Sequence, residues 1–272
     1  MLAPAALERL LPQVVTLAER AGAAIIQVYD SADSNARLKA DSSPVTDADL
    51  RANQLIVEAL QELTPDVPII SEEQPLPSLA SRAHWEEHWL VDPLDGTKEF
   101  LARNGEFTVN IALIQRHLAQ LGVVHVPVRH MTYRGLLGYG AWRSGAQQNA
   151  IAIHVESQCP ERPRVLGSRS HHSVSLDAVL AKLGDYQLVI AGSSLKFCLL
   201  AEGRADFYPR LSPTSEWDTA AGQAVLEAAG GCMTTLTGEP FQYNLRADCV
   251  NPGFLAFADR SRDWSRLVND GD

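Results

Sequence analysis

The chain has 272 residues, of which 46% are hydrophobic and 21% are charged, and its formal net charge is −10. This composition is typical of a soluble globular protein with a substantial core, and it excludes a low-complexity or fibrous chain. The sequence has no basic stripe, which argues against nucleic acid as a partner. An acidic protein that handles an anionic ligand must supply positive charge locally, and a bound metal ion is one source of it.

The four cysteines are scattered along the sequence and form no Cys-x-x-Cys pair: Cys159, Cys198, Cys232 and Cys249. This pattern favours reduced thiols and a cytoplasmic location over a disulfide framework or a zinc site. The first residues show no basic segment followed by an apolar one, so we expect no signal peptide. No stretch is apolar over the roughly 18 residues that a transmembrane helix requires.

Two helices are predicted in the first quarter of the chain. Apolar residues recur at helical spacing over residues 7–25, which indicates an amphipathic helix packed on the core. A helix on a membrane surface is the alternative, although the polar face lacks the Lys and Arg excess that anionic lipid favours. The second helix is expected to begin at Thr46 or Asp47, both good cap residues, and to end at Pro65.

Short apolar runs then predict two buried strands, each of which ends at acidic residues. The first covers residues 67–70 and delivers Ser71-Glu72-Glu73 at its end, and the segment 74–82, rich in Pro and Ser, predicts a loop. The second covers residues 88–91 and should stop at the acidic turn Asp92-Pro93-Leu94-Asp95-Gly96-Thr97.

The pattern of the remaining chain changes near residue 150. Before it, apolar and polar residues alternate and predict an antiparallel sheet with strands at 107–113, 122–126 and 133–139. After it, strands are expected at 164–166 and 187–190, and helices at 194–202 and 218–229. We therefore predict layered α/β structure in one compact unit, with an α+β half over residues 1–150 and an α/β half over residues 151–272.

The acidic turn gathers two carboxylates, a hydroxyl and backbone carbonyls at the end of a strand. Pro93 removes a backbone donor, and Gly96 permits a bend that most residues resist. Hard divalent cations bind such oxygen clusters, especially when phosphate oxygens complete the shell. An ordinary acidic turn is the alternative. Asp218 is open to two interpretations as well, because an acid in the first turn of a helix is stabilised by the helix dipole.

Three motifs in the same order and spacing resemble the inositol monophosphatase superfamily. They are Ser71-Glu72-Glu73, Asp92-Pro93-Leu94-Asp95-Gly96-Thr97 and Trp217-Asp218-Thr219-Ala220-Ala221. Lys98-Glu99-Phe100, which follows the acidic turn, is similar to the branch of bacterial CysQ-type 3′(2′),5′-bisphosphate nucleotidases. The likeness extends from the first helix to Asn251-Pro252-Gly253-Phe254. It implies the layered αβαβα fold of sugar phosphatases and a Mg²⁺-dependent phosphomonoesterase with two metal ions, or three.

The resemblance also implies the roles of individual residues. Glu72, Asp92 and the Leu94 carbonyl would hold one Mg²⁺, and Asp92, Asp95 and Asp218 would hold a second. Either Glu72 or Glu73 is expected to face the turn, because adjacent side chains on an extended segment point apart. Asp47 and Thr97 match the pair that orients the attacking water, with Asp47 as general base. A helix cap is the alternative role for Asp47.

The substrate contacts are also carried over from the resemblance. Backbone amides, two hydroxyls and a lysine in Gly192-Ser193-Ser194-Leu195-Lys196 would form a cradle for a second phosphate. The predicted contacts are Glu72, Leu94, Asp95, Gly96, Thr97, Ser168, His171, Gly192, Lys196 and Asp218. Arg210 either reaches a phosphate or pairs with an acid, and both interpretations stay open.

The expected reaction is hydrolysis of the 3′-phosphate of adenosine 3′,5′-bisphosphate to AMP and phosphate, with 3′-phosphoadenylyl sulfate as a further substrate and Li⁺ as an inhibitor. A sugar- or inositol-phosphate phosphatase on the same scaffold is the nearest alternative. A non-catalytic nucleotide sensor ranks below it. Weak peripheral association with the cytoplasmic face of the inner membrane is left open.

Overall fold

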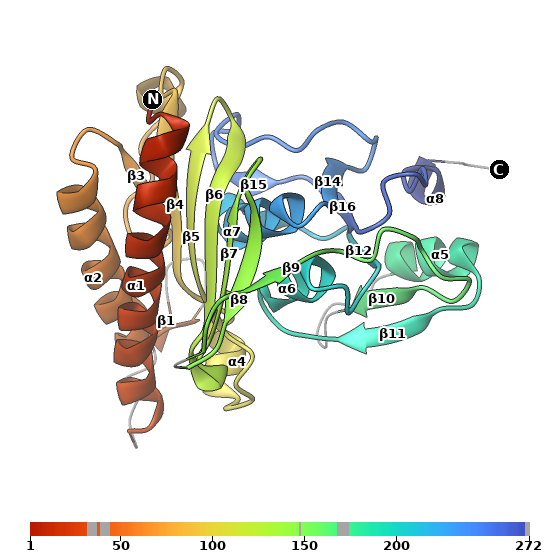
Figure 1. The fold of residues 1–272 in the computed structure, drawn as a ribbon, viewed down its shortest axis with the longest axis horizontal. Helices are drawn as coiled ribbons and strands as arrows, with labels where there is room; N and C mark the ends of the chain where they lie inside the picture. The colour runs from red at the N-terminus through yellow and green to blue at the C-terminus, as the bar shows by residue number, and fades with distance from the viewer. Residues whose placement is uncertain (32–36, 39–43, 147, 168–173, 270–272) are drawn as a thin grey trace.

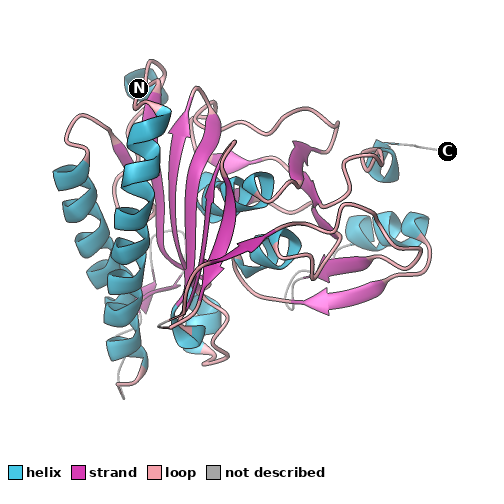
Figure 2. Ribbon diagram, viewed as in Figure 1, coloured by secondary structure: helices cyan, strands magenta, loops and turns pink. Residues whose placement is uncertain are grey.

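The structure is a computed structural model that describes residues 1–31, 37–38, 44–146, 148–167 and 174–269. Five layers follow one another across the molecule: helices α1 and α2, a seven-stranded sheet, helices α6 and α7, a five-stranded sheet, and helices α5 and α8 (Figure 1). Figure 2 shows the same succession coloured by secondary structure. The predicted layered αβαβα fold is confirmed.

The elements of the described residues have the following bounds. The helices are α1 (Pro4–Tyr29), α2 (Asp47–Leu63), α3 (Leu79–Arg82), α4 (Thr97–Leu101), α5 (Val174–Leu183), α6 (Leu195–Ala201), α7 (Glu216–Ala228), α8 (Arg266–Asn269) and the 3₁₀ turn η1 (Pro127–Arg129). The seven-stranded sheet comprises β3 (Ile69–Ser71), β4 (Glu87–Asp95), β5 (Thr108–Gln115), β6 (Leu118–Val126), β7 (Met131–Leu136), β8 (Gly140–Ser144) and β9 (Ile151–Ile153). The five-stranded sheet comprises β10 (Arg164–Gly167), β11 (Gln187–Ile190), β12 (Phe207–Arg210), β14 (Cys232–Thr235) and β16 (Phe254–Phe257). Two small ribbons pair β1 (Arg37–Leu38) with β2 (Pro44–Val45), and β13 (Thr214–Ser215) with β15 (Val250–Asn251).

Helix α1 packs its apolar face on the seven-stranded sheet, as predicted for a core helix. Val14 and Ala18 are fully buried and belong to one hydrophobic cluster with Ile111 and Val123 of the sheet. Helix α2 lies beside α1 and contributes Ile56 to the same cluster (Figure 1). No helix among the described residues is long and apolar enough to cross a membrane.

The seven-stranded sheet confirms the predicted antiparallel block. Its strands follow chain order, β3 runs parallel to β4, and every later pair is antiparallel. Strands β8 and β9 escaped prediction because they have only five and three residues, too few for alternation to stand out.

Strand β4 continues through the acidic turn, so the predicted end of this strand at Asp92 is wrong. Asp92 pairs with Asn110 of β5, and Asp95 pairs with Thr108, with an irregularity in register between the two pairs. Pro93 has no backbone donor for the ladder, and the irregularity lets the strand continue past it. The turn is therefore held by the sheet on one side, which fixes where its carboxylates point.

Helix α7 lies unusually close to β6 and β7 because two glycines face it. A Cβ atom at Gly122 would lie 2.3 Å from the carbonyl oxygen of Ala221, and one at Gly135 would lie 2.7 Å from that of Ala224. Any larger residue would push the helix away from the sheet. The close contact thus fixes the position of the first turn of α7, which carries Asp218.

The five-stranded sheet has the order β11-β10-β12-β16-β14. Its strands β10 and β11, and the helices α6 and α7, confirm the elements predicted beyond residue 150. Strands β12, β14 and β16, which have four residues each like β10 and β11, were not predicted, and β12 contains Pro209, a residue that disfavours a strand assignment. The segment predicted as a loop at 74–82 also contains the single helical turn α3.

One hydrophobic cluster joins the two halves of the chain. It contains Leu90 and Val124 from the large sheet together with Leu200 and Phe254 from beyond residue 150. The halves therefore share a core, and the boundary near residue 150 stays a prediction.

Candidate active site

Asp92 is the buried centre of an acidic group at the end of β4. Its side chain is 1% exposed, and its Oδ1 accepts a hydrogen bond from the Leu94 N–H at 3.0 Å. Burial raises the pKa of Asp92 well above its ordinary value, and the nearby carboxylates of Glu72 and Asp95 raise it further. A carboxylate in this position is unfavourable when it is charged and has no cation beside it.

Glu72, Asp92 and Asp218 form a group that fits a metal ion. One oxygen from each of the three carboxylates lies within 4.8 Å of the others. Hard divalent cations are coordinated by carboxylate oxygens, and such a cation would remove the repulsion that raises the pKa of Asp92. Glu72 directly follows β3, Asp92 lies in β4 and Asp218 in α7, so the fold brings together residues separated by up to 146 positions in sequence (218 − 72).

Glu72 reaches the group because β3 and β4 are parallel neighbours. The Glu72 N–H donates to the Val91 carbonyl at 3.1 Å, which places the residue after β3 level with the end of β4. Glu72 is the residue of the pair that joins the group, and Glu73 is not part of it among the described residues. This outcome agrees with the expectation that one of the two faces the turn.

Asp218 caps the start of α7 and also lies in the carboxylate group. Its Oδ2 accepts from the Ser215 N–H at 2.8 Å and completes a capping box at the start of α7. The same side chain contributes an oxygen to the carboxylate group with Glu72 and Asp92. Burial, and then the charge of Asp95, raises the pKa of Asp218 well above its ordinary value.

Asp95 lies beside this group but is not one of its three members. Its Oδ2 accepts from the Ser194 N–H at 2.6 Å and from the Asn110 side chain at 3.3 Å. The Ser194 hydroxyl in turn donates to the Asp218 carbonyl at 2.6 Å. Ser194 and Asn110 thus connect the two acidic residues, and sequence reasoning assigned neither of them this part. Coordination of a metal by Asp95 stays a prediction.

The hydroxyl of Thr97 donates to Asp49, and the predicted pair with Asp47 is corrected. The distance from Thr97 Oγ1 to Asp49 Oδ1 is 3.3 Å. Asp47 instead lies 3.9 Å from the guanidinium of Arg37, and its side chain is 26% exposed. Asp49 is 2% exposed, and burial raises its pKa above the ordinary value.

The capping box of α2 explains why Asp49 faces the site. Thr46 is the N-cap, and Asp49 Oδ2 accepts from both the N–H and the hydroxyl of Thr46, at 2.7 and 2.6 Å. An acid three residues after the N-cap must turn back over the helix start to make these bonds, whereas an acid at the first position need not. The pattern Thr-x-x-Asp at 46–49 was the signal that could have identified Asp49.

The Leu94 carbonyl and Gly96 complete the turn. Thr97 Oγ1 also lies 3.5 Å from the Leu94 carbonyl oxygen, so this oxygen is close to the Thr97 and Asp49 pair. Gly96 is the N-cap of α4 with φ +93°, a conformation that is costly for residues with a Cβ atom. The turn therefore needs glycine at this position, as the sequence predicted.

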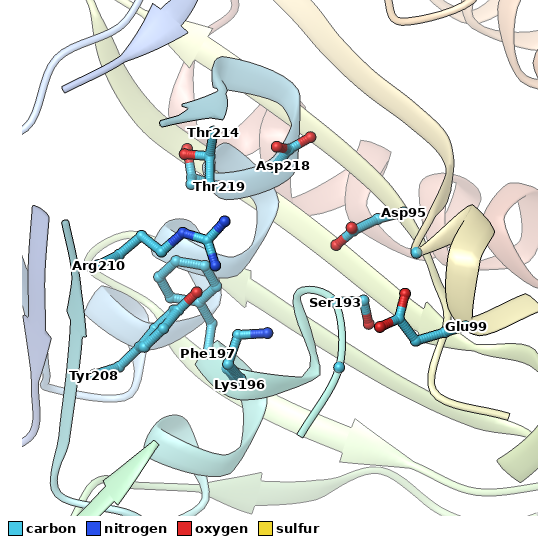
Figure 3. Close-up of a pocket in the computed structure, with 12 residues that line it drawn as sticks. Asp95, Glu99, Ser193, Lys196, Phe197, Tyr208, Arg210, Thr214, Asp218 and Thr219 are labelled. Atoms are coloured by element: carbon cyan, nitrogen blue, oxygen red, sulfur yellow. The ribbon is translucent and has the colours of Figure 1, made fainter. Parts of the chain in front are cut away.

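A pocket of about 550 Å³ opens beside the carboxylates and contains two cationic side chains. Figure 3 shows Asp95 and Asp218 on one side of it, with Lys196 and Arg210 farther in. Its other lining residues are Gly96, Glu99, Gly192, Ser193, Phe197, Tyr208, Thr214 and Thr219. The combination suits a ligand with one anionic group near the carboxylates and another near the cations.

Lys196 is buried in the wall of this pocket. Its Nζ donates to the Ala191 carbonyl at 3.2 Å and lies 5.5 Å from the centroid of the Tyr208 ring. Burial lowers the pKa of Lys196 to about 8, although Asp95 acts in the opposite direction. Arg210 donates through Nε to the Ser212 carbonyl at 3.3 Å and also lines the pocket.

Two backbone N–H groups of the predicted phosphate cradle at residues 192–196 already donate hydrogen bonds within the protein. The Gly192 N–H donates to Glu106 Oε2 at 2.8 Å, and the Ser194 N–H donates to Asp95. These two amides are used by carboxylates of the protein and do not point at a phosphate. The predicted contacts Ser168 and His171 lie outside the described residues.

Residues 6–258 match the model of the inositol monophosphatase family, and the chain belongs to this family. It is similar to the 3′(2′),5′-bisphosphate nucleotidase CysQ of Escherichia coli (strain K12), with 49% identity over 246 residues, 90% of this chain and 98% of the relative. The CysQ protein of Haemophilus influenzae is 35% identical over 96% of this chain and 97% of its own length.

Solved structures agree with this assignment. The crystal structure of CysQ from Bacteroides thetaiotaomicron has a TM-score of 0.77 and 40% identity, and the match covers 90% of this chain and 95% of that one. An inositol monophosphatase from Anabaena (Nostoc) sp. PCC 7120 has a TM-score of 0.73 at 24% identity, which shows a shared fold. The family resemblance seen in the sequence motifs is confirmed.

Proposed function

We propose that the chain is a Mg²⁺-dependent 3′(2′),5′-bisphosphate nucleotidase that hydrolyses the 3′-phosphate of adenosine 3′,5′-bisphosphate to AMP and phosphate. 3′-Phosphoadenylyl sulfate carries the same 3′-phosphate and is the further substrate that we propose. The observation that carries the proposal is the position of the carboxylate group beside a pocket with two cations, Lys196 and Arg210. The reacting phosphate would lie at the carboxylates and the second phosphate at the cations.

The relatives support the same reaction. The Escherichia coli protein, named a 3′(2′),5′-bisphosphate nucleotidase, matches this chain over 98% of its own length at 49% identity.

The metal ligands would be divided between two sites. Glu72, Asp92 and the Leu94 carbonyl would hold one Mg²⁺, and Asp92, Asp95 and Asp218 would hold the second. When bound, the two ions would neutralise phosphate oxygens and lower the pKa of a nearby water molecule. The raised pKa values of Asp92 and Asp218 support cation binding at this group, because buried acids that repel one another are stabilised by cations.

Thr97 and Asp49 would orient the attacking water and accept its proton. The Thr97 hydroxyl donates to Asp49, so its lone pairs stay available to accept from a water. Asp49 is held rigidly by Thr46, which leaves Oδ1 as the oxygen directed at Thr97. A general base that is fixed in this way contributes through orientation as well as through proton transfer.

The test compares two substrates in saturating Mg²⁺. We expect kcat/KM for adenosine 3′,5′-bisphosphate to exceed that for inositol 1-phosphate by about 100-fold or more, because an unfilled cationic pocket leaves buried charges unpaired. Equal values, or a preference for inositol 1-phosphate, would overturn the proposal in favour of an inositol-phosphate phosphatase. Tight nucleotide binding without release of phosphate would indicate a sensor.

We also propose that the protein acts in the cytoplasm. All four cysteines carry free thiols, which is typical of a reducing compartment. Weak association with the inner membrane is the alternative, and co-sedimentation with anionic vesicles would detect it.

A further inference from the structure

The loop between β11 and α6, residues 191–194, forms one wall of the pocket and holds an unfavourable backbone conformation. Ser193 has φ +44°, which lies in the left-handed region that residues with a Cβ atom rarely adopt. Its Oγ is buried, lines the pocket, and has no hydrogen-bond partner among the described residues. Figure 3 shows Ser193 facing Glu99 and the space between Asp95 and Lys196.

Strained conformations persist only where the surrounding structure holds them. Among the hydrogen bonds that attach this loop are those from Lys196 Nζ to the Ala191 carbonyl, from the Gly192 N–H to Glu106 Oε2, and from the Ser194 N–H to Asp95 Oδ2. Lys196 and Asp95 already have parts in the proposed reaction. Glu106 accepts a hydrogen bond from the N–H of Gly192, the residue before Ser193, and has no assigned part in the proposed reaction.

Glu106 is placed between the two walls of the pocket. It is 9% exposed and lies just before β5, whose residues pair with the acidic turn. A Cβ atom at Gly192 would lie 2.8 Å from the Glu106 carbonyl oxygen, and one at Gly96 would lie 3.4 Å from the same atom. The backbone of Glu106 therefore touches both the glycine of the acidic turn and the glycine of the loop.

The side chain of Glu106 is suited to a fixed role. Its Oε2 is 2.8 Å from the Gly192 nitrogen, and Oε1 lies 3.8 Å from the guanidinium of Arg129. A hydrogen bond to a charged acceptor is stronger than one between neutral groups. Gly192 also has no room for a side chain at this contact, so the loop and Glu106 fit each other closely.

We propose that Glu106 is a positioning residue for substrate recognition, which holds Gly192 and Ser193 so that the loop presents its polar groups to the part of the substrate remote from the reacting phosphate. This inference rests on the proposed function. It predicts that loss of the bond to Gly192 weakens binding of a bisphosphate nucleotide and leaves a small phosphate monoester unaffected.

Two substitutions at Glu106 separate the effect of the carboxylate's position from the effect of its charge. Glu106→Asp keeps the charge but withdraws the carboxylate by one methylene, so the bond to Gly192 is broken. Glu106→Gln keeps the length and an oxygen acceptor but removes the charge. Because a hydrogen bond to a charged group contributes substantially, we expect Glu106→Asp to raise KM for adenosine 3′,5′-bisphosphate by roughly tenfold. Glu106→Gln should stay within about threefold of the original KM, since its bond to the amide is kept.

The controls use p-nitrophenyl phosphate, a second variant and a structural readout. With p-nitrophenyl phosphate, kcat/KM should be the same in both Glu106 variants. Arg129→Ala removes the ion pair but keeps the bond to Gly192, so its KM for the nucleotide should not change. Amide hydrogen exchange at Gly192, measured by NMR, should accelerate in Glu106→Asp and stay slow in Glu106→Gln.

Three outcomes would overturn the inference. They are an unchanged KM in Glu106→Asp, an equal loss in Glu106→Gln and Glu106→Asp, and an equal loss with p-nitrophenyl phosphate. The second would show that the loss does not depend on the bond to Gly192, which Glu106→Gln keeps, and the third would assign the effect to the group of Glu72, Asp92 and Asp218. Failure of the unsubstituted protein to hydrolyse the bisphosphate would instead overturn the proposed function, so the two failures are distinguishable.

Discussion

Thr97 and Asp49 are joined by a hydrogen bond that links the acidic turn to the first turn of α2. Thr97 Oγ1 donates to Asp49 Oδ1 at 3.3 Å, while Asp49 Oδ2 is held by the backbone and hydroxyl of Thr46. One carboxylate therefore caps a helix with one oxygen and serves the candidate active site with the other. The two functions do not compete, because they use different oxygens.

Substitution of Asp49 should abolish most of the activity, whereas substitution of Asp47 should not. Asp49→Asn keeps the size of the side chain but removes the proton acceptor, so we expect kcat to fall by about 10²–10⁴-fold. Asp47→Asn should keep kcat within about twofold, since Asp47 is partly exposed and lies beside Arg37. Steady-state rates with adenosine 3′,5′-bisphosphate test both.

A loss of stability must be separated from this effect. The cap at Thr46 contributes about 0.5–2 kcal/mol to helix stability, so Asp49→Asn should also lower the Tm slightly. Thr46→Ala serves as the control, because it weakens the same cap and leaves the carboxylate in place. Full loss of activity in Thr46→Ala would show that the cap, and not proton transfer, accounts for the result.

Asp47 and Asp49 show which residues of this site sequence patterns identified and which they did not. The motifs located the acidic turn, Glu72 and Asp218, because each lies at the end of a strongly apolar or helical segment. Two acids within three residues could not be separated in that way. Their difference lies in a capping box, whose sequence signal is the spacing of Thr46 and Asp49.

Contacts between distant segments were beyond prediction for a different reason. Glu106 and Gly192 are 86 residues apart, and Asn110 and Ser194 are 84 apart. Asn110 lies on a predicted strand, and Gly192 and Ser194 lie in the predicted phosphate cradle, but these local patterns do not show which distant segments pack together. The packing of β5 and the residues before it against the loop before α6 brings the pairs together. The layers were predictable because helical and strand periods are local properties.

Removal of metal should destabilise the protein in a pH-dependent way. Asp92 has a raised pKa in the folded state, so without metal the folded protein binds more protons than the unfolded one above the ordinary carboxyl pKa. The stability of the metal-free protein should therefore fall as the pH rises from that value, and recover as the pH is lowered. Mg²⁺ should remove this dependence by neutralising the charge.

Thermal unfolding between about pH 5 and pH 8, a range above the ordinary carboxyl pKa, measures the effect in EDTA and in Mg²⁺. We expect the gain in Tm on addition of Mg²⁺ to be larger at the higher pH. In EDTA, Asp92→Asn should be more stable than the original protein at the higher pH, since it removes a buried charge. An equal gain in Tm at both ends of the range would contradict the assignment of Asp92 to a metal site.

The affinity for the nucleotide should decrease above about pH 8. The pKa of Lys196 is lowered to about 8 by burial, so the free ammonium is lost above this pH and one cation leaves the pocket. We expect KM for adenosine 3′,5′-bisphosphate to rise as the pH passes through that value, while KM for p-nitrophenyl phosphate stays constant. Lys196→Ala should raise KM for the nucleotide at pH 7 and remove its dependence on pH.

The guanidinium of Arg82 should be required for stability. It is fully buried, and it donates to the Pro77 carbonyl at 3.1 Å, to the Ala247 carbonyl at 2.9 Å and to the side chain of Asn244. The Asn244 N–H donates to Glu216, the first residue of α7, at 2.8 Å. The segment after Glu72 is thereby tied to the helix that carries Asp218.

Arg82→Ala leaves several buried carbonyls and the Asn244 side chain without this partner, so we expect a loss of about 3–5 kcal/mol in the free energy of unfolding. Urea unfolding monitored by tryptophan fluorescence measures it, and Arg9→Ala, an exposed position on α1, should change stability by less than about 0.5 kcal/mol. Arg82 connects the segment after Glu72 to the helix that carries Asp218, and both acids belong to the carboxylate group. Arg82→Ala should therefore also bind Mn²⁺ more weakly in a calorimetric titration, under conditions in which the variant is folded. A normal affinity for Mn²⁺ together with reduced stability would show that Arg82 stabilises the fold and does not affect metal binding. Unchanged stability would show that the hydrogen bonds of Arg82 are not required.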